Sequence, residues 1–414
     1  MADDRRSNET IKDGPSGWLL VFALFIMLSV VVAARNSIGL LMPIWNQEFQ
    51  WSYGFVSAAG SVMLLTMACI APLAGYFIDH HGYKNVFAAG MTVIAVAFFF
   101  CSWMTEGWQL ICFYSLLAGV GFAVISPSLV AATVAQFFEK QVGLATSMAT
   151  SGSTGGQVAL MPLLGLLIMS TSWRSGLTVV SLLILATMIL LLVLLKGRSF
   201  SQASGTKFVR QKSLPEILIL LSYQKTFWLL SGGFFICGFT TVGIIKIHFI
   251  PYAVFCGFPV VQSSLAYGVL SGFSLFGMIL YGYWSDRFNR PLLLASIYFL
   301  RALTFVLLMH ISDSVFTLFF FAVAFGLFDY ATFPILASLV STHIGRPIMG
   351  VTMGIIFSSH SVGGALGSFL GGYLFELFAK YDWVWVLGFC LAVLAGILSL
   401  CISESRGDQA VPKS

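Results

Sequence analysis

Charged residues are scarce in this chain: Asp, Glu, Lys and Arg together make up only 9% of its 414 residues. A soluble protein needs a far more polar composition to keep its surface in water. Here 58% of the residues are hydrophobic, and the mean hydropathy is +0.93. The composition therefore excludes a soluble globular protein and predicts an integral membrane protein.

Sequence patterns that are typical of several other classes of protein are also missing. There are no short alternating segments of the kind that form transmembrane β-barrels, no phosphate-binding P-loop and no clustered metal ligands. The seven cysteines are scattered along apolar stretches without redox or metal-binding spacing, which is typical of packing residues. The few polar positions offer no set of nucleophile, acid and base, so we expect no enzyme, no cofactor and no metal.

Long apolar runs are what the chain has in abundance. Each is about 20 residues or longer, the length with which an α-helix crosses a hydrocarbon core of about 30 Å. They predict an all-α integral membrane protein, and the first run is too long for a signal peptide. The twelve predicted transmembrane helices cover residues 17–44, 54–78, 85–104, 108–136, 143–169, 174–196, 226–255, 261–284, 291–309, 314–341, 349–376 and 383–403.

The basic residues predict the orientation, because Lys and Arg in short loops stay on the cytoplasmic side. Of the 21 Lys and Arg residues, the loops opposite the termini hold only Arg174 and Lys380. We expect both termini in the cytoplasm, and the compact loops favour a bacterial cytoplasmic (inner) membrane. The net charge of +5 then reflects topology, and it implies neither a nucleic-acid partner nor an acidic one.

The longest polar stretch divides the chain in two. Residues 197–225 are rich in Ser, Gly, Lys and Arg and predict a cytoplasmic linker, of which 214–222 can form a short helix on the membrane surface. The domains that we expect are an N-terminal six-helix bundle at 1–196 and a C-terminal six-helix bundle at 226–414. We expect the protein to be a monomer.

An internal repeat supports that division. The loop after the second predicted helix reads GYFIDHHGYK, and the loop after the eighth reads GYWSDRFNRP. In each, a glycine precedes an aspartate by four residues, and basic residues follow. Such a carboxylate can pair with an arginine or cap a neighbouring helix N-terminus, in a contact that must break when two halves move. The residues of this predicted conformational latch are Gly75, Asp79, Gly82, Lys84, Gly282, Asp286, Arg287 and Arg290.

The repeated loop resembles the signature G-x-x-x-D-R-x-G-R-[RK] of the major facilitator superfamily, with His80, Tyr83 and Asn289 as departures. Two further stretches resemble signatures of its monocarboxylate porter family: DGPSGWLLVF before the first helix and FFEKQVGLATSMATSG leading into the fifth. The resemblance implies two pseudo-symmetric six-helix bundles that transport small carboxylates such as lactate, pyruvate or oxalate, or aromatic acids, with protons or by exchange. Many members carry an arginine in the eighth helix, which residues 265–283 lack.

Four charged residues lie in the interior of the predicted helices, away from their ends, where each costs at least about 2.5 kcal/mol unless it faces a cavity or a partner. They are Arg35, Lys246, Arg301 and Asp329. At 1.5 Å per residue, Arg301 and Asp329 reach similar depths near the middle of the membrane. We expect these two residues to form an ion pair, which leaves the other two cations without a carboxylate.

Arg35 and Lys246 are the candidate anion-binding residues. Pro43 and Pro251, at which we expect the first and seventh helices to be interrupted, place the two cations in matching outer parts of their spans. In the superfamily fold that the resemblance implies, helices one, four, seven and ten line a central cavity, so both cations would face it. An alternative for Lys246 is that its ammonium extends to water at the outer interface.

Two histidines are titratable neighbours of these charges. His248 follows Lys246 by about 200° of helix rotation, so only one of the two can point squarely into a cavity. His360 is flanked by serines, and we expect it to form a hydrogen-bonded helix contact, with a proton relay as the alternative.

These observations predict a secondary active transporter that carries a small organic anion across the lipid bilayer by alternating access, coupled to protons. Two alternatives stay open: an exporter of a zwitterionic or amphipathic solute, such as a metallophore or a drug, and a non-transporting sensor with the same fold. The expected substrate-binding residues are Arg35, Lys246, Tyr330, Tyr114 and Tyr267, and the expected ion-pair or coupling residues are Asp329, Arg301, His248 and His360.

Overall fold

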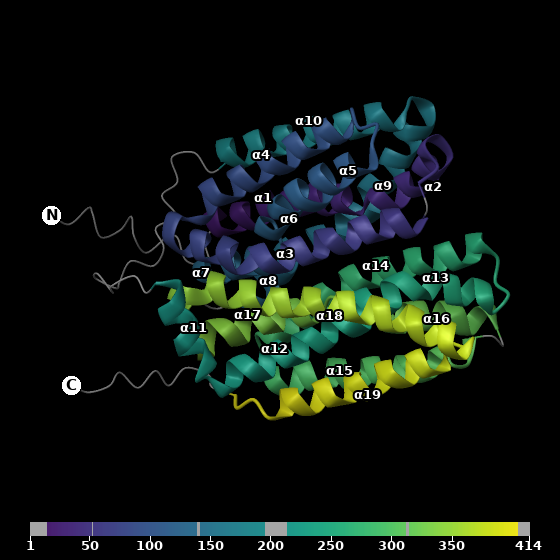
Figure 1. Cartoon of the computed structure of the whole chain (residues 1–414). Coiled ribbons are helices and arrows are strands. Elements are labelled where there is room, and N and C mark those ends of the chain that lie inside the picture. The colour runs from purple at the N-terminus through teal and green to yellow at the C-terminus, as the bar shows by residue number, and fades with distance from the viewer. Residues whose placement is uncertain (1–14, 52, 139–140, 195–212, 312–313, 405–414) are drawn as a thin grey trace, which may run out of the picture.

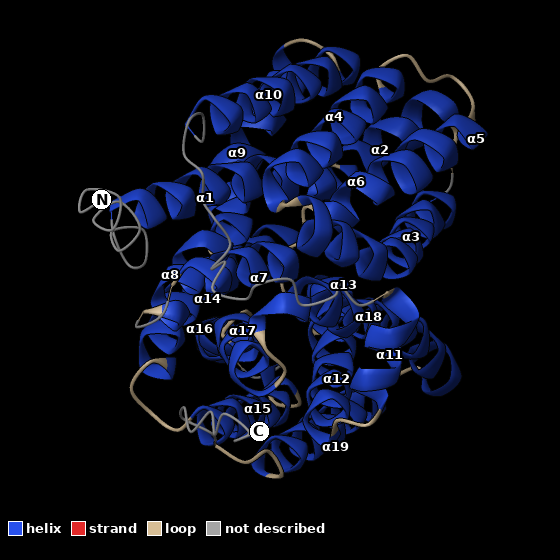
Figure 2. Cartoon of the chain, turned by 90° about the vertical axis from the view of Figure 1, so that its left-hand side faces the viewer, coloured by secondary structure: helices blue, strands red, loops and turns tan. Residues whose placement is uncertain are grey.

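The computed structural model describes residues 15–51, 53–138, 141–194, 213–311 and 314–404, and their secondary structure is helical throughout (Figures 1 and 2). The first part of the chain forms α1 (Pro15–Asn36), α2 (Ile38–Phe49), α3 (Tyr53–His81), α4 (Tyr83–Cys101), α5 (Gly107–Gln109), η1 (Leu110–Ala118), α6 (Gly119–Val124), α7 (Pro127–Phe137), α8 (Val142–Thr150), α9 (Gly152–Ser170) and α10 (Trp173–Leu194). The second part forms α11 (Leu214–Ser222), α12 (Lys225–Gly238), η2 (Phe239–Ile245), α13 (Lys246–Phe255), α14 (Val260–Ser285), α15 (Arg290–Leu308), α16 (Val315–Asp329), α17 (Thr332–His343), η4 (Arg346–Ile348), α18 (Met349–Phe378) and α19 (Asp382–Leu400).

Twelve helical runs among the described residues are long and apolar enough to cross a membrane, which confirms the number predicted from the apolar runs. The short helix α11 lies where one was expected near the end of the linker, and Ser213 and Glu216 form a capping box at its start. The rest of the predicted linker up to residue 212 lies outside the described residues. Figure 1 shows α1 begin and α19 end at the same end of the molecule, as an even number of spans requires.

Four of the spans that carry candidate site residues, the first, fourth, seventh and tenth, are irregular, whereas α4, α10, α15 and α19 each cross as one continuous helix. The first span breaks at Ser37, the fourth contains the π-helix η1 and breaks at Ser126, and the tenth breaks at Tyr330. The seventh contains the π-helix η2. Broken helices at membrane depth are tolerated only where protein or a water-filled cavity surrounds them, and π-turns are frequent at functional sites.

The two prolines do not interrupt their helices as expected. Position 43 lies within α2, and Pro251 lies within α13. A membrane helix tolerates a proline where neighbouring groups or small local adjustments satisfy the carbonyl that loses its partner. The irregular backbone lies instead at Ser37 and in η2, directly before Lys246.

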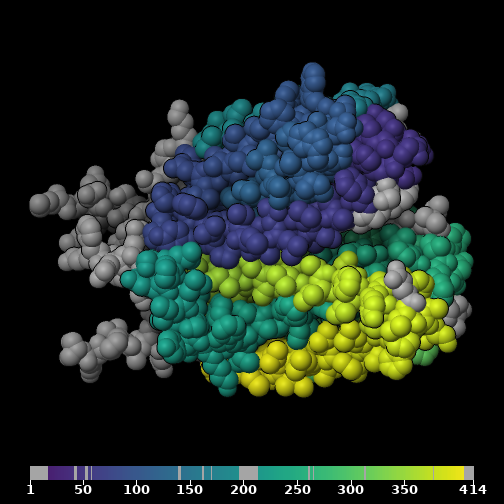
Figure 3. All heavy atoms as spheres, viewed as in Figure 1, coloured from purple at the N-terminus to yellow at the C-terminus, as the bar shows by residue number. Residues whose placement is uncertain are grey.

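The N-terminal half (α1–α10) meets the C-terminal half (α12–α19) chiefly where α3 packs on α18 and α8 packs on α14, and α17 also packs on α7 and α8. Figure 3 shows the atoms of α3 (purple-blue) lying directly on those of α18 (yellow-green). Glycines permit this approach: a Cβ at Gly75 would lie 2.1 Å from the carbonyl oxygen of Gly350, and one at Gly354 would lie 2.4 Å from that of Ala71. We call the end that holds Gly75 and Gly350 the latch end and the opposite end the far end. Figure 2 views the molecule from the latch end, where α7 and α8 pack against α14, α17 and α18.

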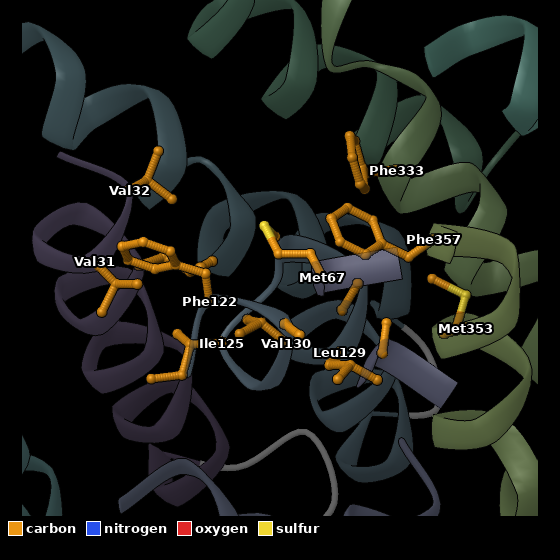
Figure 4. Packing of buried hydrophobic residues seen from close by; sticks show 14 of the residues in the cluster. Val31, Val32, Met67, Phe122, Ile125, Leu129, Val130, Phe333, Met353 and Phe357 are labelled. Atoms are coloured by element: carbon orange, nitrogen blue, oxygen red, sulfur yellow. The ribbon is translucent and has the colours of Figure 1, made fainter. Parts of the chain in front are cut away.

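Apolar side chains seal the space between the halves next to this contact. Met67 and Phe122 of the N-terminal half and Phe333 and Phe357 of the C-terminal half belong to one buried cluster that crosses the interface. Figure 4 shows Phe333 and Phe357 extending from the C-terminal half toward Met67. We call these four residues the apolar gate. A second buried cluster lies wholly within the C-terminal half.

A polar cluster ties α2 to α10 at the far end. Glu48 accepts a hydrogen bond from Nε1 of Trp173 at 2.5 Å and one from Nη1 of Arg174 at 2.6 Å. The Arg174 guanidinium also lies 4.2 Å from the Trp173 ring centroid. The hydrogen bond from Arg174 lowers the pKa of Glu48 below its ordinary value.

We expect Glu48→Gln to lower the melting temperature at neutral pH by about 1–2 °C, because exposed ion pairs contribute no more than about 1 kcal/mol. The folded-state pKa of Glu48 is depressed, so its contribution is present above the ordinary carboxyl pKa and is lost as the pH falls through the folded-state value. The difference in melting temperature between wild type and variant should therefore shrink as the pH falls below the ordinary carboxyl pKa. If the difference in melting temperature stays constant with pH, the ionised Glu48 carboxylate does not stabilise the protein through Arg174.

Candidate substrate site

Lys246, at the start of α13, lies at the centre of a polar cluster. Its Nζ donates a hydrogen bond to the hydroxyl of Tyr330 at 2.5 Å and lies 4.0 Å from the centroid of that ring. Its Nζ also lies 3.7 Å from Oδ2 of Asp329, to which Ser274 of α14 donates at 3.3 Å. The side chain of Lys246 is 19% exposed, whereas that of Asp329 is 3% exposed. The ammonium is therefore the accessible member of the pair.

Arg301, on α15, is fully buried beside this cluster. Its Nη2 donates to the main-chain carbonyls of Phe328 and of Asp329, the latter at 2.9 Å. Its Nη1 donates to Sγ of Cys237 at 3.2 Å. The guanidinium thus binds the carbonyl end of α16, where cations are favoured because the last carbonyls of a helix lack helical partners.

The expected Arg301–Asp329 ion pair is therefore wrong. The two residues do meet, as their depths predicted, but Arg301 contacts the main chain of Asp329, and the carboxylate of Asp329 pairs with Lys246. The expectation that Lys246 lacks a carboxylate is wrong for the same reason. The alternative in which its ammonium extends to water at the interface does not fit its contact with Tyr330.

Arg35 lies in the last turn of α1 and is held there by its main chain, since the hydroxyl of Tyr114 donates to its carbonyl oxygen at 2.5 Å. Within the part of the chain that the structure describes, the Arg35 guanidinium has no hydrogen bond or ion pair. Tyr114 is itself 3% exposed, so it positions the end of α1. Tyr267, on α14, lies within electrostatic range of Lys246 and Asp329.

The two histidines have different surroundings. His248 packs on α18, where its Nε2 lies 3.2 Å from the carbonyl oxygen of Ser368, so Lys246 is the residue of that pair that joins the polar cluster. His360 is buried and stacks on Phe357 of the apolar gate, with 5.8 Å between ring centroids. Its helix contact is thus aromatic rather than the expected hydrogen bond. His360 also lies within electrostatic range of Arg35, Lys246 and Arg301.

Two members of the polar network were not among the expected site residues. Ser274 follows Tyr267 by seven residues, which places both on one face of α14, so extending the stripe of polar residues along that helix would have found it. Cys237 is fully buried and contacts Arg301 and Thr332. Nothing in its apolar sequence surroundings distinguishes it from a packing residue.

The latch carboxylates cap helices of the opposite half. Asp79 accepts hydrogen bonds from the main-chain N–H groups of Gly350 and Val351, at 3.0 and 2.9 Å. Asp286 does the same to Gly143 and Leu144, at 2.8 and 3.0 Å. In both cases these are the second and third residues of the capped helix, whose N–H groups have no helical partner. Both carboxylates therefore take the helix-capping role that the sequence allowed.

The remaining latch residues shape the loops, allow the halves to approach each other, or bind residues of their own half. Gly82 has a φ of +79°, which a glycine adopts without strain, and it precedes α4. A Cβ at Gly282 would lie 2.7 Å from the carbonyl oxygen of Gly143, so this glycine allows α14 to approach α8. Arg287 lies over the ring of Tyr283, at 3.5 Å from the centroid. The other two latch residues are Lys84, the second residue of α4, and Arg290, which binds Glu404, Ser338 and Thr342 of its own half.

Comparisons with known proteins agree with this architecture. A family model described as Major Facilitator Superfamily matches residues 24–314 and 256–413. An uncharacterized MFS-type transporter of Bacillus subtilis (strain 168), YcxA, is 24% identical over 372 residues, which cover 88% of this chain and 90% of that protein. Monocarboxylate transporter 13 of Rattus norvegicus is 24% identical over 404 residues, which cover 95% of this chain and 92% of that protein.

Solved structures share the fold at lower identity. The crystal structure of the E. coli fucose:proton symporter FucP has a TM-score of 0.75 at 15% identity and covers 94% of this chain and 98% of its own. The human organic anion transporter MFSD10 (TETRAN) has a TM-score of 0.74 at 16% identity and covers 93% of this chain and 100% of its own. Because the family model spans most of the chain, and twelve spans with paired latch loops form one such fold, this protein belongs to the major facilitator superfamily and is a transporter rather than an enzyme.

Proposed function

We propose that the protein is a secondary active transporter that moves a small organic anion of the monocarboxylate type across a bacterial cytoplasmic membrane by alternating access, coupled to protons. In this proposal the latch end and both termini face the cytoplasm. The observation that carries it is the charge within the spans. Of the three cations inside the spans, Arg35, Lys246 and Arg301, only Lys246 has a carboxylate partner among the described residues, and that partner is Asp329. An excess of positive charge in a low-dielectric site favours an anionic ligand.

Three further observations support the proposal. The guanidinium of Arg35 is unpaired within the described chain, and the Lys246 ammonium is more exposed than its carboxylate partner, so both cations remain able to bind a carboxylate. The caps at Asp79 and Asp286 close the latch end in a way that a movement of the halves can reverse. Several of the similar proteins are named monocarboxylate transporters, and one of the similar structures is named an organic anion transporter.

We expect purified protein in vesicles to accumulate labelled lactate, pyruvate or oxalate when the outside is acidified. Arg35→Gln should weaken binding of the transported acid by about tenfold or more, because charge-assisted hydrogen bonds contribute about 1.5–3 kcal/mol. Arg174→Gln is the matched control, since Arg174 pairs with Glu48 at the far end. If acidification drives no carboxylate uptake and Arg35→Gln binds small acids as wild type does, the monocarboxylate proposal is wrong.

A zwitterionic substrate is the second candidate. The Lys246–Asp329 pair presents both signs of charge in one place, and a solute with an ammonium and a carboxylate could replace both partners. Competition between labelled lactate and unlabelled amino acids in the same vesicles separates the two candidates. Inhibition by amino acids but not by simple carboxylates would favour the zwitterion.

A further inference from the structure

A groove opens on the surface of the N-terminal half, between α3 and α4. It has a volume of about 430 Å³, and the helices that form it belong to three candidate membrane spans. Figures 1 and 2 both show α6 between α3 and α4, on which it packs, so that α6 forms the floor. Apart from Asn85, the groove is lined by apolar residues, among them Leu73, Phe77, Ala89, Val93, Val120 and Val124. We call this feature the α3–α4 groove.

The groove faces the bilayer rather than the other half of the protein. Phe77 is 49% exposed and Leu73 is 41% exposed, although both lie within a membrane-spanning helix. With 3.6 residues per turn, Phe77 lies about 160° around α3 from Gly75 and from Asp79, which contact α18. The groove and the latch contact therefore occupy opposite faces of α3, and both can be filled at the same time. Within the membrane the groove meets hydrocarbon instead of water.

The depth of the groove fits one leaflet of the bilayer. Phe77 and Asn85 line it near the latch end, whereas Ile70 and Val93 line it about 10–12 Å deeper, at 1.5 Å per residue. One leaflet contributes about 15 Å of the hydrocarbon core. The volume lies within the range of about 300–1,000 Å³ that is usual for ligand sites. An acyl chain that enters from the latch end can therefore lie along the groove without leaving its own leaflet.

Polar groups lie at the mouth of the groove, where α3 ends and α4 begins. His81 is exposed, follows Phe77 by one helical turn and contacts its ring, with 5.5 Å between the centroids. Asn85 is exposed and lines the groove in the first turn of α4. Gly82 precedes α4 and offers no side chain to cap it, and the positive end of the helix dipole favours an anion there. An imidazole and an amide can both donate hydrogen bonds to phosphate oxygens.

We propose that the α3–α4 groove binds one phospholipid from the leaflet at the latch end. One acyl chain fills the groove, where empty space would forfeit dispersion contacts. The phosphodiester lies at the mouth, beside His81, Asn85 and the start of α4. The juxtaposition of an apolar groove and a mouth that favours an anion distinguishes this site from the general contact of a spanning helix with lipid. The lipid site is separate from the candidate substrate site, so it exists whichever solute is transported.

Native mass spectrometry of the delipidated full chain in detergent tests the groove, because it counts the lipids that stay bound. With added palmitoyl-oleoyl phosphatidylglycerol, wild type should retain one lipid under conditions that remove the others. Ala89→Phe places a ring in the groove and should lose that lipid. Ala186→Phe is the matched control and should retain it, because Ala186 is also exposed on a spanning helix but lies on α10, outside the groove. Retention by Ala89→Phe equal to that of wild type would overturn the proposal, as would a broad distribution of weakly held lipids on wild type.

A change of headgroup tests the mouth. The double variant His81→Phe/Asn85→Leu should bind phosphatidylglycerol about tenfold more weakly than wild type, because hydrogen bonds to a charged group are the strong ones. A diacylglycerol with the same acyl chains lacks the phosphate, so it should bind wild type more weakly than phosphatidylglycerol does and should bind the double variant as it binds wild type. If the double variant binds phosphatidylglycerol as wild type does, or if wild type does not distinguish the two lipids, the phosphate does not lie at the mouth and the proposed site is wrong.

Discussion

Gly75→Ala should open the latch end. An added Cβ would lie 2.1 Å from the carbonyl oxygen of Gly350, which is a backbone atom and cannot rotate away. Overpacking of this kind typically costs about 1–3 kcal/mol, which shifts the equilibrium between closed and open states by about 5-fold to 150-fold. The clash exists only while α3 and α18 touch, so it destabilises the closed state and leaves each half intact.

Gly60→Ala provides the matched control, because Gly60 is on the same helix and a Cβ there would meet no atom within 4 Å. Spin labels at His81 and Pro347, which are exposed and lie in opposite halves at the latch end, report the separation of the halves. We expect a longer distance in Gly75→Ala and an unchanged one in Gly60→Ala. Equal distances in the two variants would mean that the glycine contact does not hold the latch end closed.

Lys246→Met should destabilise the protein more than any single change at its surface. It leaves the 3% exposed carboxylate of Asp329 without its cation, and breaking a buried pair in this way costs about 3–5 kcal/mol. The double variant Lys246→Met/Asp329→Asn should recover most of the loss, because it removes both charges. Thermal or denaturant unfolding measures the stability of wild type, of the two single variants and of the double variant. These four proteins form a double-mutant cycle.

Ile247→Met is the control for introducing a methionine in this part of α13, since Ile247 is the next residue along the chain and is 43% exposed. It should change stability little. If the effects of Lys246→Met and Asp329→Asn simply add in the double variant, the two side chains do not interact in the membrane as their 3.7 Å separation indicates.

The helices and the charged residues could be predicted from the sequence, because both depend on local properties. Apolar runs of sufficient length form spans wherever they occur, and a charge within such a run is conspicuous at once. The pairing of those charges could not be predicted, because it depends on the rotation of each helix as well as on depth. Arg301 and Asp329 do lie at matching depths, yet the guanidinium meets the main chain of Asp329.

The π-helix η2 explains part of this failure. It occupies Phe239–Ile245, directly before Lys246, and its wider turns change the direction in which later side chains of that span point. A regular 3.6-residue period carried along α12 therefore gives the wrong direction for Lys246. The latch aspartates show a second limit. Their loops were recognised from the repeat, but a cap on α8 or α18 joins residues far apart in sequence.

The apolar gate gives the transport cycle a dependence on temperature. Met67, Phe122, Phe333 and Phe357 are all at most 5% exposed while the latch end is closed, so opening it brings water onto apolar surface. Hydration of apolar surface raises the heat capacity and becomes less unfavourable on cooling. The equilibrium between the two states should then follow a curved van't Hoff plot, and cold should favour the state that is open at the latch end.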